Sequence, residues 1–488
     1  MKVNLVNSTL DSVECDALIV PVFEDDDFNQ PPVSRLEGLW GGLLKEMADS
    51  GEWKGKTGQQ VTIHRPAGIK ARRVVVAGAG KRANFDSAAV RQLMMSVAHR
   101  LKDKELQRIA AYRRSQIPLE SAVQSAVEGL LLGAWQIDEY KTESRARGPA
   151  EVQLVMEEEI TTESEKALGR GEIMGRATNL ARCLANEPGN RLNPTLLATK
   201  AQEIGEKYDL EVEVFDERDM EERGMNCLLA VARGSDEPAR FIVLRHLAVP
   251  PSDQPPLVYI GKGVTFDSGG LSLKSPQSME DMKLDKAGAC AVLAALQAIA
   301  QLQAPVNVVG LIPAVENLPS GRAQKPGDII RSMSGKTIEV VNTDAEGRLI
   351  LADALHYARS LNPHLIVDLA TLTGACVVAL GQFRAGLFCN NEELYQRFLA
   401  AAARSGEKFW RLPLDDDYRK ELESRIADIK NVGSKWGGAI TAAKFLQEFV
   451  GDTPWCHIDM AGVDSFPDGD ELKGPTGFGT RTLVELAL

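Results

Sequence analysis

The sequence lacks long hydrophobic runs and any excess of basic residues. No apolar run among the 488 residues reaches the roughly 18–20 residues that a membrane-spanning helix needs. Lysine and arginine together number 56 against 68 aspartates and glutamates, and the formal net charge is −12. Proteins that bind a phosphate backbone need clustered lysine and arginine, and no long basic run is present. Membrane-spanning and nucleic-acid-binding roles are therefore disfavoured.

The sequence is also poor in cysteine and histidine. The cysteines form no C-x-x-C pair and lie far apart, at Cys15, Cys183, Cys227, Cys290, Cys376, Cys389 and Cys456. Their odd number and wide spacing predict buried, reduced thiols. The six histidines are scattered and form no H-E-x-x-H motif, which disfavours a zinc site built on histidine. Residues 1–8 show neither the pattern nor the cleavage site of a secretion signal, so we expect a cytoplasmic protein.

Strand and helix patterns alternate along most of the chain. Its length predicts about two to three domains, and its 44% hydrophobic content is enough for large cores. We expect an α/β fold with a smaller amino-terminal α/β domain over residues 1–155, a connecting helix over residues 156–185, and a larger domain over residues 186–488, in which helices flank a central mixed β-sheet. In the first domain the pattern predicts strands at residues 2–5, 17–21 and 73–77 and helices at residues 87–102 and 119–132.

A group of ionisable residues occupies the joint between a predicted strand, residues 337–341, and a predicted helix, residues 349–361. This joint reads Asn342-Thr-Asp-Ala-Glu-Gly-Arg-Leu349. Asp344 and Glu346 stand two residues apart, so in an extended chain they project to one side and offer oxygen ligands to a cation. The alternative is ordinary helix capping, in which aspartate and glutamate are common, and this joint alone does not decide between the two.

The same joint also suits an anion. The N–H groups of Ala345 and Gly347 fall at the predicted helix N-terminus, beside the guanidinium of Arg348. Helix N-termini and arginine both bind anions through oriented N–H donors. A metal site and an anion site would then be neighbours.

A second segment adds two carboxylates. The predicted strand 257–260 runs into Gly261-Lys-Gly-Val-Thr-Phe-Asp-Ser-Gly-Gly270, and Asp285 precedes an apolar run, residues 286–302, that predicts a buried helix. Ligand sites in alternating α/β sheets gather at the carboxyl ends of strands, so Asp267 and Asp285 are expected beside the first pair. Four carboxylates cannot all ionise close together without compensation, and two divalent cations would neutralise them. The sequence thus indicates an oxygen-rich site of the kind that two-metal hydrolases use.

Two lysines lie close to these carboxylates in the sequence. Glycines flank Lys262 on both sides, which favours a role in the site. For Lys262 and Lys274 alike, the alternative is an ordinary exposed or salt-bridged lysine. A phosphoesterase would use the same four carboxylates, so these residues leave the substrate class open.

The segments Lys262–Gly270 and Asn342–Leu349 resemble the signature motifs of the cytosolic leucyl aminopeptidase family. Further similarity is found in Asp281-Met-Lys-Leu-Asp285, Asp368-Leu-Ala-Thr-Leu-Thr-Gly-Ala375 and Gly474-Pro-Thr-Gly-Phe-Gly-Thr-Arg481. The likeness covers residues 170–488, whereas residues 1–150 show only the general pattern of the family's variable amino-terminal domain. The resemblance implies a metal-dependent aminopeptidase that acts on short peptides.

The resemblance implies two divalent metal ions per subunit, Mn2+ or Zn2+. By similarity, one ion is held by Asp267, Asp344 and Glu346, with the main-chain carbonyl of Asp344 contributing. The other is held by Lys262, Asp267, Asp285 and Glu346, so that Asp267 and Glu346 bridge the two ions. Lys262 can bind a metal only as the neutral amine, and two adjacent dications would lower its pKa enough to permit this.

The resemblance also implies a mechanism with Lys274 and Arg348 as catalytic residues. A water that bridges both metals becomes a hydroxide and attacks the scissile carbonyl. The substrate's free amino group binds the metal on the side of Lys262 and Asp285, which restricts cleavage to amino termini. Lys274 is expected to stabilise the developing oxyanion. A bicarbonate ion serves as the proton shuttle, seated on Arg348 and the N–H groups of Ala345, Gly347 and Leu372.

The resemblance extends to the substrate pocket and to assembly. Positions that line the family's pocket match Met282, Asn342, Thr371 and Leu372. An apolar pocket favours leucine and other mainly apolar residues but discriminates weakly, because one methylene is worth only about 1–3 kcal/mol. The family assembles as hexamers around an internal cavity that restricts access to short peptides, so we expect a homohexamer.

Lys286 departs from the family pattern, in which many relatives have a methionine after the matching aspartate. We expect its charge to lie near the second metal and to alter metal preference or residue selectivity. His457, two residues before Asp459, is interpreted as a packing histidine, because the implied metal ligands are complete without it. Some bacterial relatives bind DNA, so a DNA-binding accessory protein is the alternative function.

Overall fold

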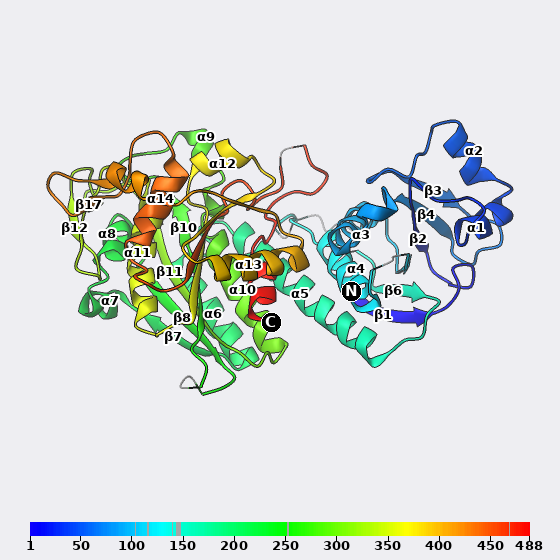
Figure 1. Ribbon diagram of the computed structural model, residues 1–488, viewed down its shortest axis with the longest axis horizontal. Coiled ribbons are helices and arrows are strands. Elements are labelled where there is room, and N and C mark those ends of the chain that lie inside the picture. Colours follow the sequence, from blue (N-terminus) through cyan, green and yellow to red (C-terminus); the bar gives the residue numbers. More distant parts are fainter. Residues whose placement is uncertain (103, 115–116, 139, 143–147, 251–252, 468) are drawn as a thin grey trace. The chain divides into compact units, whose positions relative to one another are not determined.

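The computed structural model describes residues 1–102, 104–114, 117–138, 140–142, 148–250, 253–467 and 469–488 (Figure 1). The chain divides into two compact units, Met1–Asn179 and Leu180–Leu488. The division falls inside helix α5 (Thr162–Asn186), which runs from one unit into the other. Each unit combines a β-sheet with helices, which confirms the predicted α/β class.

A six-stranded sheet organises the unit Met1–Asn179, in the order β1–β6–β5–β2–β4–β3. Neighbouring strands are parallel except β3 and β4, which are antiparallel. The strands are β1 (Lys2–Asn7), β2 (Ala17–Val22), β3 (Gln60–His64), β4 (Arg73–Gly78), β5 (Arg108–Tyr112) and β6 (Glu151–Met156). The helices are α1 (Val33–Trp40), α2 (Leu43–Asp49), the short 3-10 helix η1 (Arg82–Asn84), α3 (Ser87–Leu101) and α4 (Leu119–Gly133).

Side chains of this sheet alternate between two hydrophobic clusters. Ile19 and Val75 belong to the cluster that includes residues of α3 and α4, whereas their neighbours Leu18 and Val74 belong to the cluster that includes residues of α1. Successive residues of a strand point to opposite faces, which explains the alternation. Strand β2 is buried along its whole length, as expected for a strand covered on both faces.

A nine-stranded mixed sheet organises the unit Leu180–Leu488, in the order β16–β15–β18–β14–β9–β11–β8–β7, with β10 paired to β11. The central strands β18, β14, β9 and β11 are mutually parallel, whereas β7, β8 and β15 introduce antiparallel pairs. The strands are β7 (Glu211–Phe215), β8 (Arg240–Leu247), β9 (Leu257–Gly261), β10 (Gly263–Asp267), β11 (Asn307–Asn317), β14 (Leu365–Ala370), β15 (Ala385–Cys389), β16 (Phe409–Arg411) and β18 (Trp455–Asp459). A separate small sheet contains β12 (Ile329–Arg331), β13 (Thr337–Glu339) and β17 (Ile429–Lys430).

Twelve helical segments follow α5 in the described part of this unit. They are α6 (Pro194–Tyr208), α7 (Glu217–Arg223), α8 (Asn226–Ala232), α9 (Pro276–Met279), η2 (Met282–Leu284), α10 (Ala287–Gln301), α11 (Glu346–Arg359), α12 (Gly374–Leu380), α13 (Glu392–Ser405), η3 (Asp416–Leu422), α14 (Gly438–Gln447) and α15 (Thr480–Ala487). Helix α10 is buried along nearly its whole length, because alanine, valine and leucine cover all of its faces. It packs on β9, β11 and β14 and so corresponds to the predicted buried helix over residues 286–302.

Two cysteines differ from the prediction of reduced thiols. Cys389 of β15 and Cys456 of β18 form a disulfide, so the prediction is wrong for this pair. The two residues stand directly opposite each other in antiparallel strands. Their separation of 67 residues in the sequence hides this register. The other five cysteines form no disulfide.

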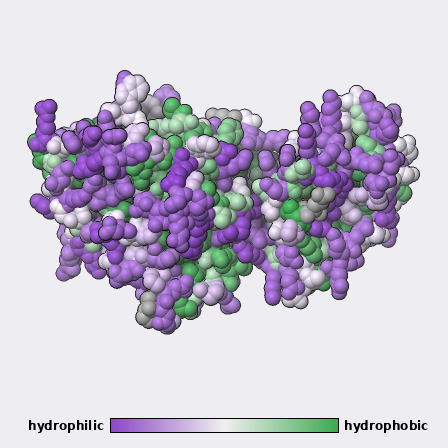
Figure 2. All heavy atoms as spheres, in the orientation of Figure 1, coloured by the Kyte–Doolittle hydropathy of each residue, from purple (hydrophilic) through white to green (hydrophobic). Residues whose placement is uncertain are grey.

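Hydrophilic side chains cover most of the face drawn in Figure 2, with smaller hydrophobic areas between them. This distribution agrees with a charged-residue content of 25%. Within the described ranges, no helix is both long enough and apolar enough to cross a bilayer.

Candidate metal centre

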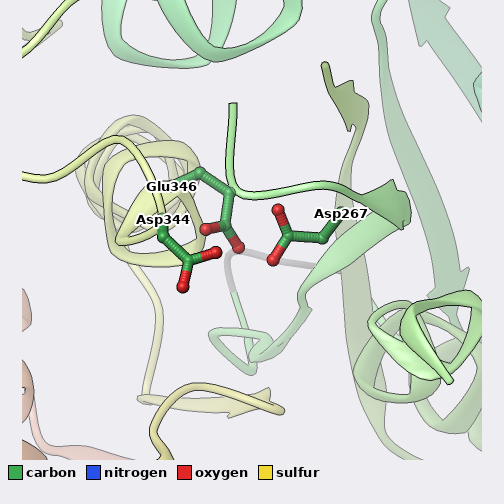
Figure 3. Close-up of side chains that lie close together, drawn as sticks. All are labelled: Asp267, Asp344 and Glu346. Atoms are coloured by element: carbon green, nitrogen blue, oxygen red, sulfur yellow. The ribbon is translucent and has the colours of Figure 1, made fainter. Parts of the chain in front are cut away.

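Three carboxylates from two separate segments face one another in the unit Leu180–Leu488. Asp267 ends strand β10, Asp344 lies in the loop before α11, and Glu346 is the first residue of that helix. One oxygen atom from each lies within 4.8 Å of the others. Figure 3 shows the three side chains pointing toward a common centre. Asp267 and Glu346 are buried, and Asp344 is half-buried. This arrangement provides hard oxygen ligands for a cation.

The local backbone differs from the extended chain that we assumed for Asp344 and Glu346. Helix α11 already begins at Glu346, so only Asp344 lies before the helix. The side-chain carbonyl of Asn342 accepts a hydrogen bond from the Asp344 N–H at 2.9 Å, which forms a tight turn. The two carboxylates therefore converge because a turn leads directly into the first helical residue.

An asparagine that the sequence pattern did not reveal holds Asp267 in place. Strands β10 and β11 are parallel neighbours, so Asp267 and Asn317 meet at their carboxyl ends. The Asn317 amide donates to Asp267 Oδ1 at 2.8 Å and to the carbonyl of Thr343 at 3.1 Å. Gly269 N–H donates to the same Asp267 oxygen at 2.8 Å. Asn317 thus couples the strand that carries Asp267 to the loop that carries Asp344.

A threonine joins the two loops of the site. The Thr343 hydroxyl donates to the Gly269 carbonyl at 2.7 Å and accepts from the Ser272 N–H at 2.8 Å. The Thr343 N–H in turn donates to the Ser272 hydroxyl at 3.1 Å. Gly269 has a φ of +87°, in the left-handed region that favours glycine, so the loop turns sharply here. These bonds fix the loop that carries Lys274.

Lys262 and Lys274 place two ammonium groups among the carboxylates. Lys262 Nζ lies 2.8 Å from Asp285 Oδ1 and 2.8 Å from Glu346 Oε1. Lys274 Nζ lies 2.8 Å from Asp267 Oδ2 and also contacts Asp344. The Thr371 hydroxyl donates to Asp285 Oδ1 at 2.6 Å, and its carbonyl accepts from Lys262 at 3.0 Å. Both lysines therefore lie among the carboxylates as ion-paired groups, and neither is an exposed lysine.

Burial and mutual repulsion dominate the electrostatics of these carboxylates. Burial raises the pKa of Asp267, and the charge of Glu346 raises it further. Burial also raises the pKa of Asp285 and of Asp344. Burial alone would lower the pKa of Lys262, but the facing carboxylates of Asp285 and Glu346 outweigh it and raise that pKa. The cluster needs positive charge to stay ionised.

Two oxygen atoms of the cluster are left without partners. Asp285 Oδ2 and Glu346 Oε2 are buried and accept no hydrogen bond within the described part of the chain. A buried polar atom without a partner is unfavourable, and a divalent cation would satisfy both carboxylates. The donor set of four carboxylates and one amine therefore fits divalent cations.

Arg348 lies beside this cluster on the first turn of α11. Its Nη1 donates to the carbonyl of Asn431 at 2.8 Å, while its Nε is buried and has no partner within the described ranges. Burial lowers the pKa of Arg348 to about 10, so the group is still a cation at neutral pH. It retains a donor with which to bind an anion.

The main-chain donors expected around that anion are arranged differently from the prediction. Leu372 N–H donates to Asp459 Oδ1 at 3.2 Å. Ala345 N–H donates to the carbonyl of Asn342 at 3.3 Å. Gly347 lies in the first turn of α11, where N–H groups have no partner within the helix. Two of the three expected N–H donors thus already have acceptors in this structure.

A cavity of about 410 Å³ opens onto the cluster. The predicted residues that line it are Lys262, Asp267, Lys274, Met282, Asn342, Asp344, Ala345, Glu346, Arg348, Thr371 and Leu372. Of the predicted residues, Asp285 and Gly347 are not among its lining. Eight further lining residues were not predicted: Thr373, Gly374, Val377, Val432, Gly438, Ala461, Gly462 and Asp464. Thr373 and Gly374 belong to the motif Asp368–Ala375, whereas the other six lie outside the quoted motifs, so no motif marks those six as lining residues.

Two other predicted residues lie outside the cluster. Lys286 is fully buried, and its ammonium group donates to the carbonyls of Glu187 at 2.7 Å and Lys283 at 2.6 Å. Its charge is thus directed to main-chain carbonyls instead of the metal site. His457 Nδ1 lies 2.6 Å from Asp368 Oδ1, within the nine-stranded sheet.

Comparisons with known proteins agree along the whole chain. Residues 179–484 match the cytosol aminopeptidase family, catalytic domain, and residues 19–144 match the N-terminal domain of the same family. A probable cytosol aminopeptidase of Solibacter usitatus is 45% identical over 490 residues, which cover 100% of this chain and 99% of that protein. A second, from Koribacter versatilis, is 41% identical over 511 residues, with coverage of 100% and 99%.

Two solved structures are similar throughout. A mutant of tomato leucine aminopeptidase is 34% identical, with a TM-score of 0.91 and coverage of 100% of this chain and 96% of that chain. The bottromycin maturation enzyme BotP in complex with Mn is also 34% identical, with a TM-score of 0.84 and coverage of 97% and 99%.

Proposed function

The chain belongs to the cytosol aminopeptidase family of metal-dependent exopeptidases, which act on peptides, and we propose that it removes leucine and other mainly apolar residues from the amino termini of short peptides. One observation carries the proposal. The carboxylates of Asp267, Asp344 and Glu346 lie within 4.8 Å of one another and line a cavity that also holds the apolar side chains of Met282 and Val377.

Two divalent ions would occupy this centre. We assign one to Asp267, Asp344 and Glu346, and the other to Lys262 and Asp285 together with the shared Asp267 and Glu346. Support comes from the partnerless oxygens of Asp285 and Glu346 and from the raised pKa of Asp285, which burial disfavours as an anion. Mn2+ or Zn2+ suits such a donor set, and the similar BotP is known in complex with Mn.

The bound ions would supply an acidified water and a polarised scissile carbonyl. The protein's own residues orient the peptide around them. Lys274 is a cation on the cavity wall, with Asp267 and Asp344 as its partners, and is placed to stabilise the oxyanion that develops. Thr371 contacts both Lys262 and Asp285 and so positions this part of the site.

Bicarbonate would act as the proton shuttle on Arg348. The buried, partnerless Nε of Arg348 and the helix N-terminus at Gly347 support an anion at this position. The N–H groups of Ala345 and Leu372 would have to exchange their present acceptors, Asn342 and Asp459, to join it. Arg348 is therefore the main support for the proposed anion site.

Substrate side chains would lie against Met282, Asn342, Thr371 and Leu372, which all line the cavity. Met282 has a flexible thioether that adapts to differently shaped apolar groups, which favours broad specificity. We propose that residues 186–488 form the catalytic domain, that residues 156–185 connect it, and that residues 1–155 form the amino-terminal domain.

We also propose a homohexamer that works in the cytoplasm. Large apolar side chains are exposed beside the cavity: Val378 is 91% exposed, next to the lining residue Val377, and Trp436 is 72% exposed. Exposed apolar groups of this kind mark interaction surfaces. A monomeric mass in light scattering would contradict this assembly.

The activity is tested by following release of the amino-terminal residue from leucyl peptides after chelation and after addition of Mn2+ or Zn2+. We expect activity to disappear with the chelator, to return with the metal, and to be absent in Asp344→Ala. The exposed Asp452→Ala is the matched control and should behave like the unchanged protein. Folded protein that cleaves no leucyl peptide with either metal would refute the proposed function.

A further inference from the structure

Asp464 brings a carboxylate into the cavity in addition to those of the metal centre. It lies five residues after the end of β18 (Trp455–Asp459) and lines the same cavity as Met282 and Val377. It is not among the residues that we assign to the metals. Its side chain is half-buried, so it borders both protein and the cavity.

The loop that carries Asp464 is held in a fixed conformation. The Thr476 N–H donates to the Asp464 carbonyl at 2.9 Å, and the Thr476 hydroxyl donates to the Val463 carbonyl at 2.6 Å. The Gly462 N–H donates to Asp464 Oδ1 at 3.1 Å. These bonds hold the carboxylate at the cavity wall without using a side-chain cation.

The charge of Asp464 is not neutralised by a nearby cation. Within the described ranges, no lysine, arginine or histidine forms an ion pair with it. Burial raises the pKa of Asp464 to about 6, and the negative charge of Asp281 acts in the same direction. The carboxyl group is therefore ionised at neutral pH, and the adjacent charge has the same sign.

We propose that Asp464 binds the cationic head of an amino-terminal lysine or arginine, so that the protein accepts basic residues as well as apolar ones. This inference rests on the proposed aminopeptidase function and extends it to a second substrate class. The methylene stem of such a residue would lie against Met282 and Val377, while its charged end reaches Asp464.

Cationic, apolar and acidic side chains of the substrate would interact differently with Asp464. A cationic head forms a charge-assisted hydrogen bond with Asp464, whereas an apolar head leaves that carboxylate unpaired. An acidic side chain would be repelled by both Asp464 and Asp281. Lysine and arginine should therefore be preferred over uncharged residues of the same length, and glutamate should be a poor substrate.

The test compares pairs of substrates that share a stem but differ in charge. We would measure kcat/KM for lysyl against norleucyl peptides, and for arginyl against citrullyl peptides, with the metal-loaded full-length protein. In the unchanged protein the charged member of each pair should be cleaved about 10-fold better, as expected for one hydrogen bond to a charged group. In Asp464→Asn this ratio should fall to about one, and in Asp464→Glu part of it should return.

Each outcome separates the inference from the proposed function. If the unchanged protein cleaves leucyl and norleucyl peptides but not lysyl or arginyl peptides, the inference is wrong and the aminopeptidase function stands. If Asp464→Asn lowers kcat/KM equally for both members of a pair, Asp464 is only structural and the inference is again wrong. If the protein cleaved none of these peptides, the proposed aminopeptidase function itself would be wrong. Asp281→Asn, at an exposed residue outside the cavity lining, should change the ratio less than Asp464→Asn.

Discussion

Buried carboxylate groups have opposite surroundings in the two units. In the unit Met1–Asn179, Asp26 follows β2, and both of its oxygens accept from Arg114, at 2.6 and 2.8 Å. Arg82 and the Phe23 N–H bind it as well. In the unit Leu180–Leu488, Asp285 and Glu346 each keep one buried oxygen that has no hydrogen-bond partner among the described residues.

The difference separates structural carboxylates from functional ones. A carboxylate whose lone pairs are all satisfied by arginine and main-chain donors stabilises its loop and has little capacity to bind a ligand. Carboxylates that are held close together with free oxygens are unfavourable unless something else binds them. The second arrangement therefore fits a metal centre, in which a cation would bind the free oxygens.

The largest effect in the unit Leu180–Leu488 is expected from Asp267→Asn, at a carboxylate that both proposed ions would share. We expect kcat/KM for leucyl peptides to fall at least about 1,000-fold, more than the ~10–100-fold that changes around metal ligands produce. Bound metal, measured by elemental mass spectrometry, should fall in parallel. The folded state should survive, because the neutral amide removes a charge that burial disfavours. If Asp267→Asn kept its metal and its full activity, Asp267 would not be a metal ligand.

The matching change in the other unit is Asp26→Asn. We expect a loss of about 3 kcal/mol in the free energy of unfolding, because Arg82 and Arg114 lose a charged partner whose side chain is only 3% exposed. Urea denaturation of the full-length protein measures this loss. Metal content and leucyl peptide cleavage by the remaining folded protein should not change. A loss of metal binding in this variant would contradict the structural role of Asp26.

Arg348→Ala extends the comparison from carboxylates to arginines. The Nε of Arg348 has no partner among the described residues, whereas Arg82 and Arg114 pair with Asp26. We expect kcat to fall about 100-fold, the scale of one general acid–base contribution. Stimulation of the unchanged protein by added bicarbonate should be absent in the variant. The measurement is kcat against bicarbonate concentration in carbonate-free buffer. If bicarbonate stimulated the unchanged protein and Arg348→Ala equally, bicarbonate would not act through Arg348.

The smallest expected effect is that of Gly347→Ala. A Cβ atom at this position would lie 2.7 Å from Lys262 Nζ, so the lysine would have to move. We expect kcat/KM to fall about 10-fold, since small displacements of positioned groups weaken catalysis. Gly321→Ala is the control, because a Cβ atom there meets nothing within 4 Å. Equal activities of the two variants would show that the position of Lys262 is not critical.

The parts of the fold that depend on local patterns were predictable. The helices expected over residues 87–102 and 119–132 correspond to α3 (Ser87–Leu101) and α4 (Leu119–Gly133), because apolar spacing is a property of neighbouring residues. The convergence of Asp267, Asp344 and Glu346 was also expected, although the reason differs from the expected one, because the strand before Asp344, β13, belongs to the small three-stranded sheet and not to the sheet that carries Asp267.

The supporting residues were not predictable in the same way. Asn317 acts on Asp267 across 50 positions, and Asn431 accepts from Arg348 across 83. Neither asparagine belongs to a motif, so only the folded arrangement reveals its role. The pairing of Cys389 with Cys456 depends on the register of β15 and β18, and one carbonyl acceptor of Lys286 is Glu187, 99 positions away in the sequence.

Helix α5 has a practical consequence for dividing the protein. The boundary between the two units, after Asn179, falls within the continuous helix Thr162–Asn186. A gene truncated at this point would encode a fragment that starts or stops in mid-helix, with up to about four main-chain groups left without partners at the new end. Anyone who expresses the catalytic unit alone should therefore keep all of α5, and chimeras with related enzymes should exchange this helix whole.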